Sequence, residues 1–485
     1  MRMLVGCLLI FAGLFPLRAE ERSYPIVDTG QVRCYDDRTE IAFPAAGARF
    51  FGQDAHYEGH VPAYKENGDG SVSDLVTGLT WQKDPGKKQT LKQALAGAKA
   101  CRLGGQKDWR VPTIKELYSL ILFTGTDPDP MSRNAKGLVP FIDTRYFVFQ
   151  YGREDKGERI IDSQYGSSTK YVSTTMRGDA TLFGVNFADG RIKGYGLIHP
   201  RTRKEKTFYF IYVRGNPAYG KNKFRDNKDG TITDSATGLI WMQADSGSVK
   251  GGPKGDGRMN WEEGLAWAEG LTHAGHSDWR MPNIKELQSL VDYTRSPKTT
   301  KSAALDPLFK PTKLTDEGGK PNYPFYWASS SHNSLHSANA ADYIAFGEAL
   351  GWMQDRRSGS RKLLDVHGAG SQRSDPKAGD PKRFPFGRGP QGDVIRIYNY
   401  VLCVRGGKAT PKTSGPAIAM KPGKGPPQQG GAGKNKFVGR LDKNGDGKIS
   451  RDEFDGPKRA FGRLDKNGDG FISGEEAPSG PPRRR

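Results

Sequence analysis

An internal duplication constrains the fold of this 485-residue chain more than any other feature. Three landmarks occur twice, in the same order. They pair residues 66–82 (ENGDGSVSDLVTGLTWQ) with 226–242 (DNKDGTITDSATGLIWM), 108–120 (DWRVPTIKELYSL) with 278–290 (DWRMPNIKELQSL), and 212–215 (YVRG) with 403–406 (CVRG). Because such a repeat encodes a repeated structural unit, the body of the chain should consist of two similar units.

The second copy is the longer one. The spacing between matched landmarks grows along the chain, so the second copy carries insertions, which we place in the Gly/Lys-rich segment 247–258 and the Gly/Pro/Arg-rich segment 368–392. A fourth, weaker match pairs YVSTT at 171–175 with YWASS at 326–330.

The NGDG and NKDG segments of the first landmark predict hairpin turns followed by short alternating strands. They also look like halves of calcium loops. That alternative fails at the first and last ligand positions, which hold Lys65 and Val76 in the first copy and Arg225 and Ala236 in the second. A cation at the first position excludes Ca²⁺, so we interpret both segments as turns.

Each copy also predicts two helices that begin with a capping box. The paired residues are Thr90 with Gln93, Thr113 with Glu116, Asn260 with Glu263, and Asn283 with Glu286. The first helix of each copy should bury one apolar stripe. The expected stripes are Leu91, Leu95 and Ala98 in the first copy, and Trp261, Leu265 and Ala268 in the second.

Two complete calcium loops stand near the end of the chain. They run DKNGDGKISRDE from Asp442 to Glu453 and DKNGDGFISGEE from Asp465 to Glu476. Ca²⁺ takes six to eight oxygen ligands, and this pattern supplies them from positions 1, 3, 5, 7, 9 and 12. The expected ligands are Asp442, Asn444, Asp446, Lys448 (carbonyl), Ser450 and Glu453, then Asp465, Asn467, Asp469, Phe471 (carbonyl), Ser473 and Glu476. We therefore expect two bound Ca²⁺ ions.

The two loops should pair with each other. Ile449 and Ile472 occupy position 8 of their loops and can lie side by side. Gly447 and Gly470 at position 6 permit the sharp turn that each loop needs.

The start of the chain indicates secretion. Met1 and Arg2 precede an apolar run from Leu4 to Leu17, which is too short to cross a bilayer and is typical of a secretory signal peptide. No later segment is apolar enough for a transmembrane span. We expect a bacterial periplasmic or cell-surface protein.

The chain is strongly basic, with a formal net charge of +20 that falls by two when Arg2 and Arg18 leave with the signal peptide. A secreted basic protein meets acidic polysaccharides more often than genomic DNA, so we expect acidic or sulfated glycans as partners and no specific nucleic acid. A merely soluble basic surface is the alternative.

Three cysteines remain after the signal peptide: Cys34, Cys101 and Cys403. This odd count allows at most one internal disulfide, and no CxxC spacing points to a metal site.

The order of landmarks, NGDGTxTDxxTGLxW, DWRxPxxKEL, YWxSS and CVRG, resembles the Lcl C-terminal domain family, named after a bacterial collagen-like adhesin. The resemblance covers roughly residues 60–215 and 220–407. It implies a secreted or surface-exposed domain with a C-type-lectin-like fold that binds sulfated glycans. The terminal loop pair is similar to the compact EF-hand tandems of secreted bacterial proteins and to dockerin modules.

The chain departs from this family at its cysteines. Many members carry one cysteine at the end of the first helix and another in the closing CVRG. Repeat 1 keeps Cys101 at the helix position but has Tyr212 at the closing position. Repeat 2 keeps Cys403 at the closing position but has Leu271 at the helix position. The disulfide that the family implies is unavailable in both copies, and the pairing of the cysteines stays open.

The sequence offers little support for catalysis. His332 with His336, and His273 with His276, could bind zinc, but the first pair lacks a metalloprotease glutamate, and we interpret all four as solvent-facing loop residues. The WRxP motif also looks like a segment of formylglycine-generating enzymes. That resemblance implies oxidase chemistry at a pair of closely placed cysteines that hold copper. Here only Cys403 lies in the C-terminal part, so the pair is missing.

Two pairs imitate an acid–base dyad: Arg110 with Glu116, and Arg280 with Glu286. We interpret each glutamate as a helix cap and each arginine as packing for the loop that enters the helix. Four tryptophans are expected in the core rather than at a sugar-binding surface: Trp81, Trp109, Trp241 and Trp279.

These observations predict an α+β protein with two tandem C-type-lectin-like domains and a small α-helical EF-hand pair. The expected segments are a signal peptide (1–19), repeat 1 with an N-terminal extension (20–215), repeat 2 (216–407), a Pro/Gly/Lys-rich linker (408–433), the EF-hand pair (434–478) and a tail (479–485). The sequence favours a non-enzymatic, secreted, calcium-binding protein with glycan-binding or adhesion-type repeats. The alternative is a structural or docking protein whose EF-hand pair binds a protein partner.

Overall fold

The structure is a computed structural model that describes the body of the chain almost continuously and the C-terminal part in pieces. The described residues are 22–355, 358–416, 436–442, 448–456, 458–465, 470–473 and 476–477. The predicted signal peptide, the tail and linker residues 417–433 lie outside them. The chain divides into two compact units, residues 1–418 and 419–485, which are described separately.

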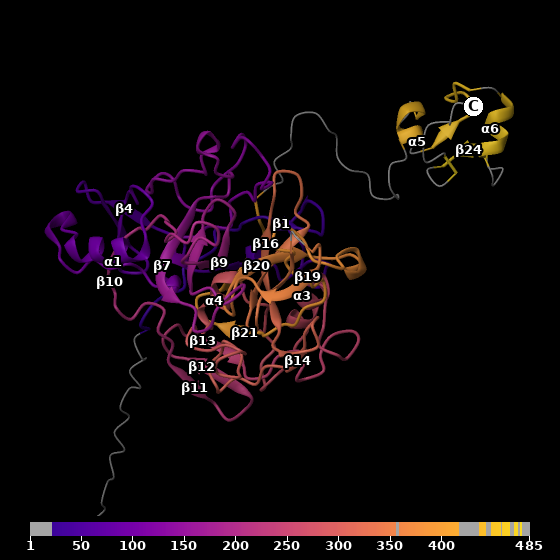
Figure 1. The fold of residues 1–485 in the computed structure, drawn as a ribbon. Helices are drawn as coiled ribbons and strands as arrows, with labels where there is room; N and C mark the ends of the chain where they lie inside the picture. The colour runs from indigo at the N-terminus through magenta and orange to yellow at the C-terminus, as the bar shows by residue number, and fades with distance from the viewer. Residues whose placement is uncertain are drawn as a thin grey trace, which may run out of the picture. The chain divides into compact units, whose positions relative to one another are not determined.

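Each repeat builds a small four-stranded antiparallel sheet from its conserved landmarks (Figure 1). The strand order is β10-β6-β5-β4 in repeat 1 and β21-β13-β12-β11 in repeat 2. The strands are β4 (Tyr64–Glu66), β5 (Ser71–Asp74), β6 (Leu79–Gln82), β10 (Val213–Gly215), β11 (Phe224–Asp226), β12 (Thr231–Asp234), β13 (Leu239–Met242) and β21 (Val404–Gly406).

The predicted hairpin turns are confirmed. In repeat 1 the Asn67 N–H donates to the Ser71 carbonyl at 3.1 Å, and Gly70 adopts the left-handed φ of 85° that the turn requires. The Asp69 carboxylate accepts hydrogen bonds from the Ser71 backbone N–H and hydroxyl at 2.9 and 2.6 Å. This carboxylate therefore serves the turn.

All four predicted capping boxes are present. They begin α1 (Leu91–Ala100), α2 (Ile114–Tyr118), α3 (Trp261–Glu269) and α4 (Ile284–Ser289). The predicted buried stripe of α3 is confirmed. The stripe predicted for α1 is wrong at Leu95, which is 42% exposed; Ala94 and Ala98 are the buried residues of that helix.

A six-stranded antiparallel sheet joins the two repeats, in the order β16-β17-β20-β9-β8-β7. Repeat 1 supplies β7 (Gln164–Lys170), β8 (Thr181–Asn186) and β9 (Arg191–Gly196), and repeat 2 supplies β16 (Phe325–His332), β17 (Ala340–Ala345) and β20 (Gln372–Pro376). The junction pairs Gln372 with Ile192. The repeats thus form one body with approximate twofold symmetry about this junction.

The structure corrects the fourth sequence match. The Ser168 and Ser329 N–H groups donate to Pro112 and Pro282 at equivalent places, each at 2.8 Å. YWASS at 326–330 therefore corresponds to YGSST at 165–169 and not to YVSTT. The physical reason is helix capping: the hydroxyl that ends the true segment accepts the first helical N–H of α2 or α4 at 3.0 Å.

Two lysines, one buried and one partly buried, lock the repeats together at their symmetry axis. Lys115 of α2 donates to the Ser289 carbonyl at the end of α4 at 2.6 Å. Lys285 of α4 donates to the Ser119 carbonyl at the end of α2 at 3.0 Å. Each ammonium group thus satisfies carbonyls that a helix end leaves without an intrahelical partner.

The N-terminal segment runs along repeat 2. It contains β1 (Cys34–Tyr35), β2 (Glu40–Ile41) and β3 (Tyr57–Glu58), and it bonds α3 through Arg49 to Glu262 and through the Tyr57 hydroxyl to Glu269. The start of the predicted linker, β22 (Thr410–Pro411), pairs with β3. No sequence pattern predicts this pairing.

Repeat 2 carries two further hairpins, β14 (Leu314–Thr315) with β15 (Pro321–Asn322) and β18 (Leu350–Gln354) with β19 (Arg361–Asp365). The four tryptophans of the landmarks are buried, as expected. Among the described residues, no helix is long and apolar enough to cross a membrane.

The C-terminal unit contains α5 (Lys436–Leu441), β23 (Ile449–Ser450), α6 (Lys458–Leu464) and β24 (Phe471–Ile472). Its own small core consists of Val438, Leu441, Ile449, Phe461, Ile472 and Ala477, with Phe437, Phe454 and Leu464 packed against it. The unit therefore shares no described core with the body.

Candidate functional sites

The two calcium loops face each other across a short strand pair. β23 and β24 pair antiparallel, with Ile449 opposite Ile472 and both side chains fully buried. This confirms the predicted pairing. It also fixes the two loops relative to each other, because position 8 of each loop belongs to the shared ladder.

Positions 9 and 12 of each loop are brought together. The Ser450 backbone N–H and hydroxyl donate to one oxygen of Glu453 at 2.9 and 2.8 Å. Ser473 donates to Glu476 in the same way at 3.0 and 2.8 Å. The glutamate predicted as the bidentate ligand is thus held beside the serine predicted to contribute directly or through water.

Position 1 of the second loop also faces inward, since the Asp465 carboxylate accepts the N–H of Gly470 at position 6 at 3.1 Å. Four predicted ligands lie outside the described residues: Asn444, Asp446, Asn467 and Asp469. The described part of the chain contains no group of three or more His, Cys, Asp and Glu that could hold a metal ion.

A basic groove of about 470 Å³ runs over α1 in repeat 1. Four lysines line it, and none of them forms an ion pair with a described residue: Lys92, Lys99, Lys170 and Lys206. Leu95 also lines the groove, so its exposed side chain forms part of the groove's apolar surface. Burial lowers the pKa of Lys206. The groove offers several unpaired cations beside an apolar strip.

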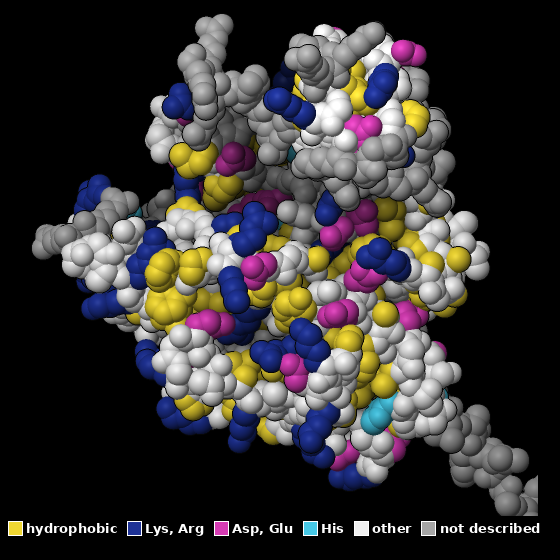
Figure 2. Space-filling model, turned by 90° about the vertical axis from the view of Figure 1, so that its right-hand side faces the viewer, with side chains coloured by type: hydrophobic (Ala, Val, Ile, Leu, Met, Phe, Trp, Pro, Cys, Tyr) yellow, Lys and Arg dark blue, Asp and Glu magenta, His cyan; other side chains and the backbone are white. Residues whose placement is uncertain are grey.

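Basic groups also spread over other faces of the body. On the face shown in Figure 2, Lys and Arg side chains lie among hydrophobic ones, with acidic side chains between them. Such a surface attracts polyanions over a distance of about a Debye length, roughly 8 Å at physiological salt.

The two Arg–Glu pairs are structural, as predicted. Arg280 donates to both carboxylate oxygens of Glu286 at 2.7 and 2.6 Å, and both side chains are buried. Glu286 at the same time caps α4 through the Asn283 N–H. Arg110 bonds Glu116 in the same arrangement but is itself 34% exposed. Neither glutamate is available as a general base.

The prediction that His332 is a solvent-facing loop residue is wrong. His332 lies in β16, is fully buried, stacks on Phe141 and bonds Asp342 through Nδ1 at 2.9 Å. The long apolar and small-residue strand before it carries it into the core. His336 is exposed and lies outside that strand, so the structure does not bring the two together.

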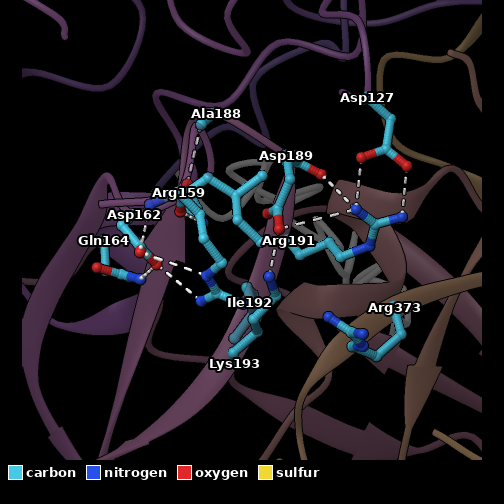
Figure 3. Close-up of polar contacts among 12 residues, drawn as sticks. Asp127, Arg159, Asp162, Gln164, Ala188, Asp189, Arg191, Ile192, Lys193 and Arg373 are labelled. Atoms are coloured by element: carbon cyan, nitrogen blue, oxygen red, sulfur yellow. Dashed lines mark hydrogen bonds and ion pairs between the residues drawn. The ribbon is translucent and has the colours of Figure 1, made fainter. Parts of the chain in front are cut away.

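A network of buried charges crosses the junction of the shared sheet (Figure 3). Arg191 of β9 makes a bidentate pair with Asp127 at 2.7 and 2.8 Å and donates to Ser374 of β20 at 2.8 Å. Burial alone would raise the pKa of Asp127, but the Arg191 guanidinium outweighs it and holds the pKa below the ordinary value. Lys193 pairs with Asp189 in the same network.

Sequence reasoning missed this network because its members come from segments without a shared motif. Arg191 of repeat 1 bonds Ser374 of repeat 2, so the network ties the repeats together. A second buried cluster lies close by, in which Asp393 pairs with both Arg373 and His367. Burial and the nearby Arg373 lower the pKa of His367 to about 4, so this histidine is neutral at pH 7.

All three described cysteines are free thiols. Cys101 packs in one apolar cluster with Tyr212, and Cys403 lies in another with Leu271. The family's disulfide is thus replaced by apolar packing at both sites. Burial raises the pKa of Cys34 to about 12, so this thiol stays protonated at pH 7.

A duplicated, β-rich body and a separate pair of calcium-type loops define a modular binding protein. Family models identify both parts: the Lcl C-terminal domain model matches residues 70–214 and 230–365, and the EF hand model matches residues 439–455 and 458–476. The two Lcl matches cover more than half of the chain, which therefore belongs to the Lcl C-terminal domain family. No curated protein and no solved structure matches the chain.

Proposed function

We propose that this protein is a secreted or cell-surface adhesion protein whose lectin-like repeats bind acidic glycans and whose EF-hand pair binds two Ca²⁺ ions. It acts by binding and not by catalysis. The C-type-lectin-like fold and the periplasmic or surface location belong to the same proposal. They are supported by the family membership and by the apolar N-terminal run.

The observation that carries the glycan proposal is the lysine groove of repeat 1. Lys92 and Lys99 project from the same helix, and Lys170 and Lys206 approach from neighbouring segments. Unpaired ammonium groups are strongly hydrated point charges, which suit flexible polyanions better than planar, bidentate ligands. Such binding should be weak and dominated by charge.

The test is retention of the full chain on immobilised heparin. Changing the four groove lysines to Gln should lower the salt concentration at which the protein elutes. A control of equal charge changes four exposed lysines elsewhere on repeat 1: Lys87, Lys107, Lys136 and Lys156.

The two variants should differ, because only the first removes a concentrated cluster. Binding to the groove should disappear at 1 M salt, where the screening length is about 3 Å. Equal behaviour of the two variants would show a diffuse basic surface. No retention at low salt would refute glycan binding.

The calcium proposal rests on the held Ser–Glu pairs at positions 9 and 12 of both loops. The unit has a core of few residues, and clustered acids repel one another without metal. Folding of the unit and metal binding should therefore be coupled. An extracellular module needs an affinity of only about 10⁻⁴ to 10⁻³ M.

Calorimetry on the full chain should give two Ca²⁺ per chain, and the variant Asp442→Ala with Asp465→Ala should give none. Both substitutions lie in the C-terminal unit and not in the body. Retention on heparin should therefore not change, and it serves as the control. If the variant instead loses a protein partner that the parent chain captures, the EF-hand pair is a docking module. No uptake at millimolar calcium would contradict the proposal.

A further inference from the structure

Repeat 2 has a second groove that repeat 1 lacks. Its volume is about 800 Å³, and its walls mix aromatic rings with cations. The aromatic residues are Phe325, Trp352, Phe384, Tyr398 and Tyr400, and the cations are Arg258, Lys313 and Arg396. Glu317 is the single carboxylate among the residues that line it.

Parts of the predicted insertions of the second copy line this groove. The segment 247–258 supplies Arg258 and places Lys254 over the Tyr398 ring at 4.5 Å. The stretch of the segment 368–392 that follows β20 supplies Pro381, Phe384 and Pro385. Extra residues that converge on one concave surface are what a grafted binding site requires.

The equivalent place in repeat 1 is different. Backbone bridges pair Gln89 with Phe208 and Met259 with Asn399, so the segment around Phe208 corresponds to the one around Asn399. There Lys88 packs over Tyr209 and is neutralised by Glu158 at 2.5 Å. The residue that corresponds to Tyr398 is Thr207. Repeat 1 thus has no tyrosine at the position of Tyr398, and its lysine at this place is paired, whereas Lys313 of repeat 2 forms no ion pair with a described residue.

Arg396 gives the groove wall a fixed, planar donor. Its guanidinium stacks on Phe325 at 4.0 Å and bonds Glu317 at 2.8 and 2.9 Å. Nη1 is buried and has no hydrogen-bond partner among the described residues, and neither has the Oδ1 acceptor of Asn399, which also lines the groove. Buried polar atoms without partners are costly, and a ligand or a water molecule offsets that cost.

We propose that this groove binds an acidic oligosaccharide, a chain of pyranose rings that carry carboxylate or sulfate groups. The aromatic rings stack against the apolar C–H faces of the sugar, and Arg258, Lys313 and Arg396 bind the acidic groups and hydroxyls. The proposal rests on the glycan-binding function proposed above and assigns to repeat 2 the part of it that reads the sugar ring.

A sugar fits these walls better than an acidic peptide. The aromatic side chains lie along the groove beside the cations, so a ligand must present apolar faces and negative charge in the same repeating unit. Hydrolysis of the sugar is not part of the proposal, because retaining and inverting glycosidases need two carboxyl groups and Glu317 is bound to Arg396.

The experiment measures binding of the calcium-loaded full chain to size-matched oligosaccharides by calorimetry. Hyaluronan fragments carry carboxylates alone, dextran sulfate carries sulfates alone, and dextran is neutral. The variants are Tyr398→Ala and Lys313→Ala in the groove, and the control is Tyr209→Ala, a tyrosine of repeat 1 at the position that corresponds to Tyr400. The quadruple lysine variant of repeat 1 is measured beside them.

We expect Tyr398→Ala to weaken one of the two acidic ligands at least tenfold and Tyr209→Ala to leave it unchanged. Lys313→Ala, which removes an exposed cation, should weaken it less and only at low salt. The groove variants should keep the charge-driven retention on heparin. The better of the two acidic ligands identifies the recognised group.

The proposal is overturned if the groove variants bind every sugar like the parent chain while the quadruple lysine variant binds none. In that case glycan binding stands and belongs to repeat 1 alone. Equal affinity for an oligoglutamate peptide would also overturn it. If the parent chain binds no acidic sugar, both the proposed glycan-binding function and the proposed groove site are refuted.

Discussion

The two repeats share one scaffold but differ in what covers them. In repeat 2 the N-terminal segment lies on α3, and the ring of Tyr57 packs over the Arg280 guanidinium at 5.1 Å. In repeat 1 no described segment covers α1 in this way: Leu95 is exposed and Arg110 is partly so. Closely similar motifs can therefore bury different amounts of charge and apolar surface, depending on which distant segment covers them.

This difference also separates the two grooves. The uncovered α1 of repeat 1 presents lysines to solvent, whereas repeat 2 covers its helix and has a groove with aromatic walls, part of which comes from inserted loops. The proposed function therefore assigns attraction of a polyanion to repeat 1 and recognition of its sugar units to repeat 2.

The largest expected effect compares the two Arg–Glu pairs. Arg280→Ala leaves Glu286 buried without its charge partner and should lower the free energy of unfolding by about 3–5 kcal/mol. Arg110→Ala should cost about 1 kcal/mol, because water reaches the Arg110 side chain, which is 34% exposed. Urea denaturation followed by circular dichroism measures both. Equal losses would mean that the N-terminal segment does not bury Arg280 in solution.

The next effect compares the matched leucines of α1 and α3. Leu265 is 1% exposed, so Leu265→Ala should cost about 2–5 kcal/mol through the cavity it leaves. Leu95→Ala removes an exposed side chain and should change the free energy of unfolding by less than about 0.5 kcal/mol. A large loss at Leu95 would show that α1 is covered after all.

The smallest effect tests the lysine lock between the repeats. Burial lowers the pKa of Lys115 to about 8 and that of Lys285 to about 7, from 10.5 for an ordinary lysine. Above these values the unfolded chain binds more protons than the folded chain. The free energy of unfolding should therefore rise with pH, by up to about 1.4 kcal/mol per pH unit for each lysine.

The measurement compares unfolding in urea at pH 8 and pH 9, below the range in which most phenols titrate. Lys115→Met with Lys285→Met should lose the rise that the two lysines contribute, and the exposed pair Lys92→Met with Lys99→Met should keep it. Identical pH slopes in both variants would contradict the buried, partly neutral state of the lock.

Local features were predicted well because neighbouring residues decide them. The capping boxes, the Asx-type hairpin turns and the Ile449–Ile472 pair all depend on side chains within a few positions of the backbone groups they serve. The same holds for the Arg–Glu pairs, which join residues six positions apart. Each of these motifs forms because the groups that it brings together are already close along the chain.

The errors fall where distant segments decide the environment. Leu95 fits a helical stripe, but nothing packs over it. His332 follows a run of serines that reads as a loop, yet strand pairing with β17 buries it. The fourth match failed because Ser- and Thr-rich pentapeptides look alike until a hydrogen bond to a helix start selects one of them.

Two related units and a pair of calcium loops can be predicted from the sequence alone, because those patterns repeat within the chain and each has its own local chemistry. The shared sheet, the reciprocal lysines and Arg191 network at its junction, and the groove of repeat 2 become evident in the folded chain. These depend on contacts between residues far apart in the sequence, which packing selects and no local pattern records.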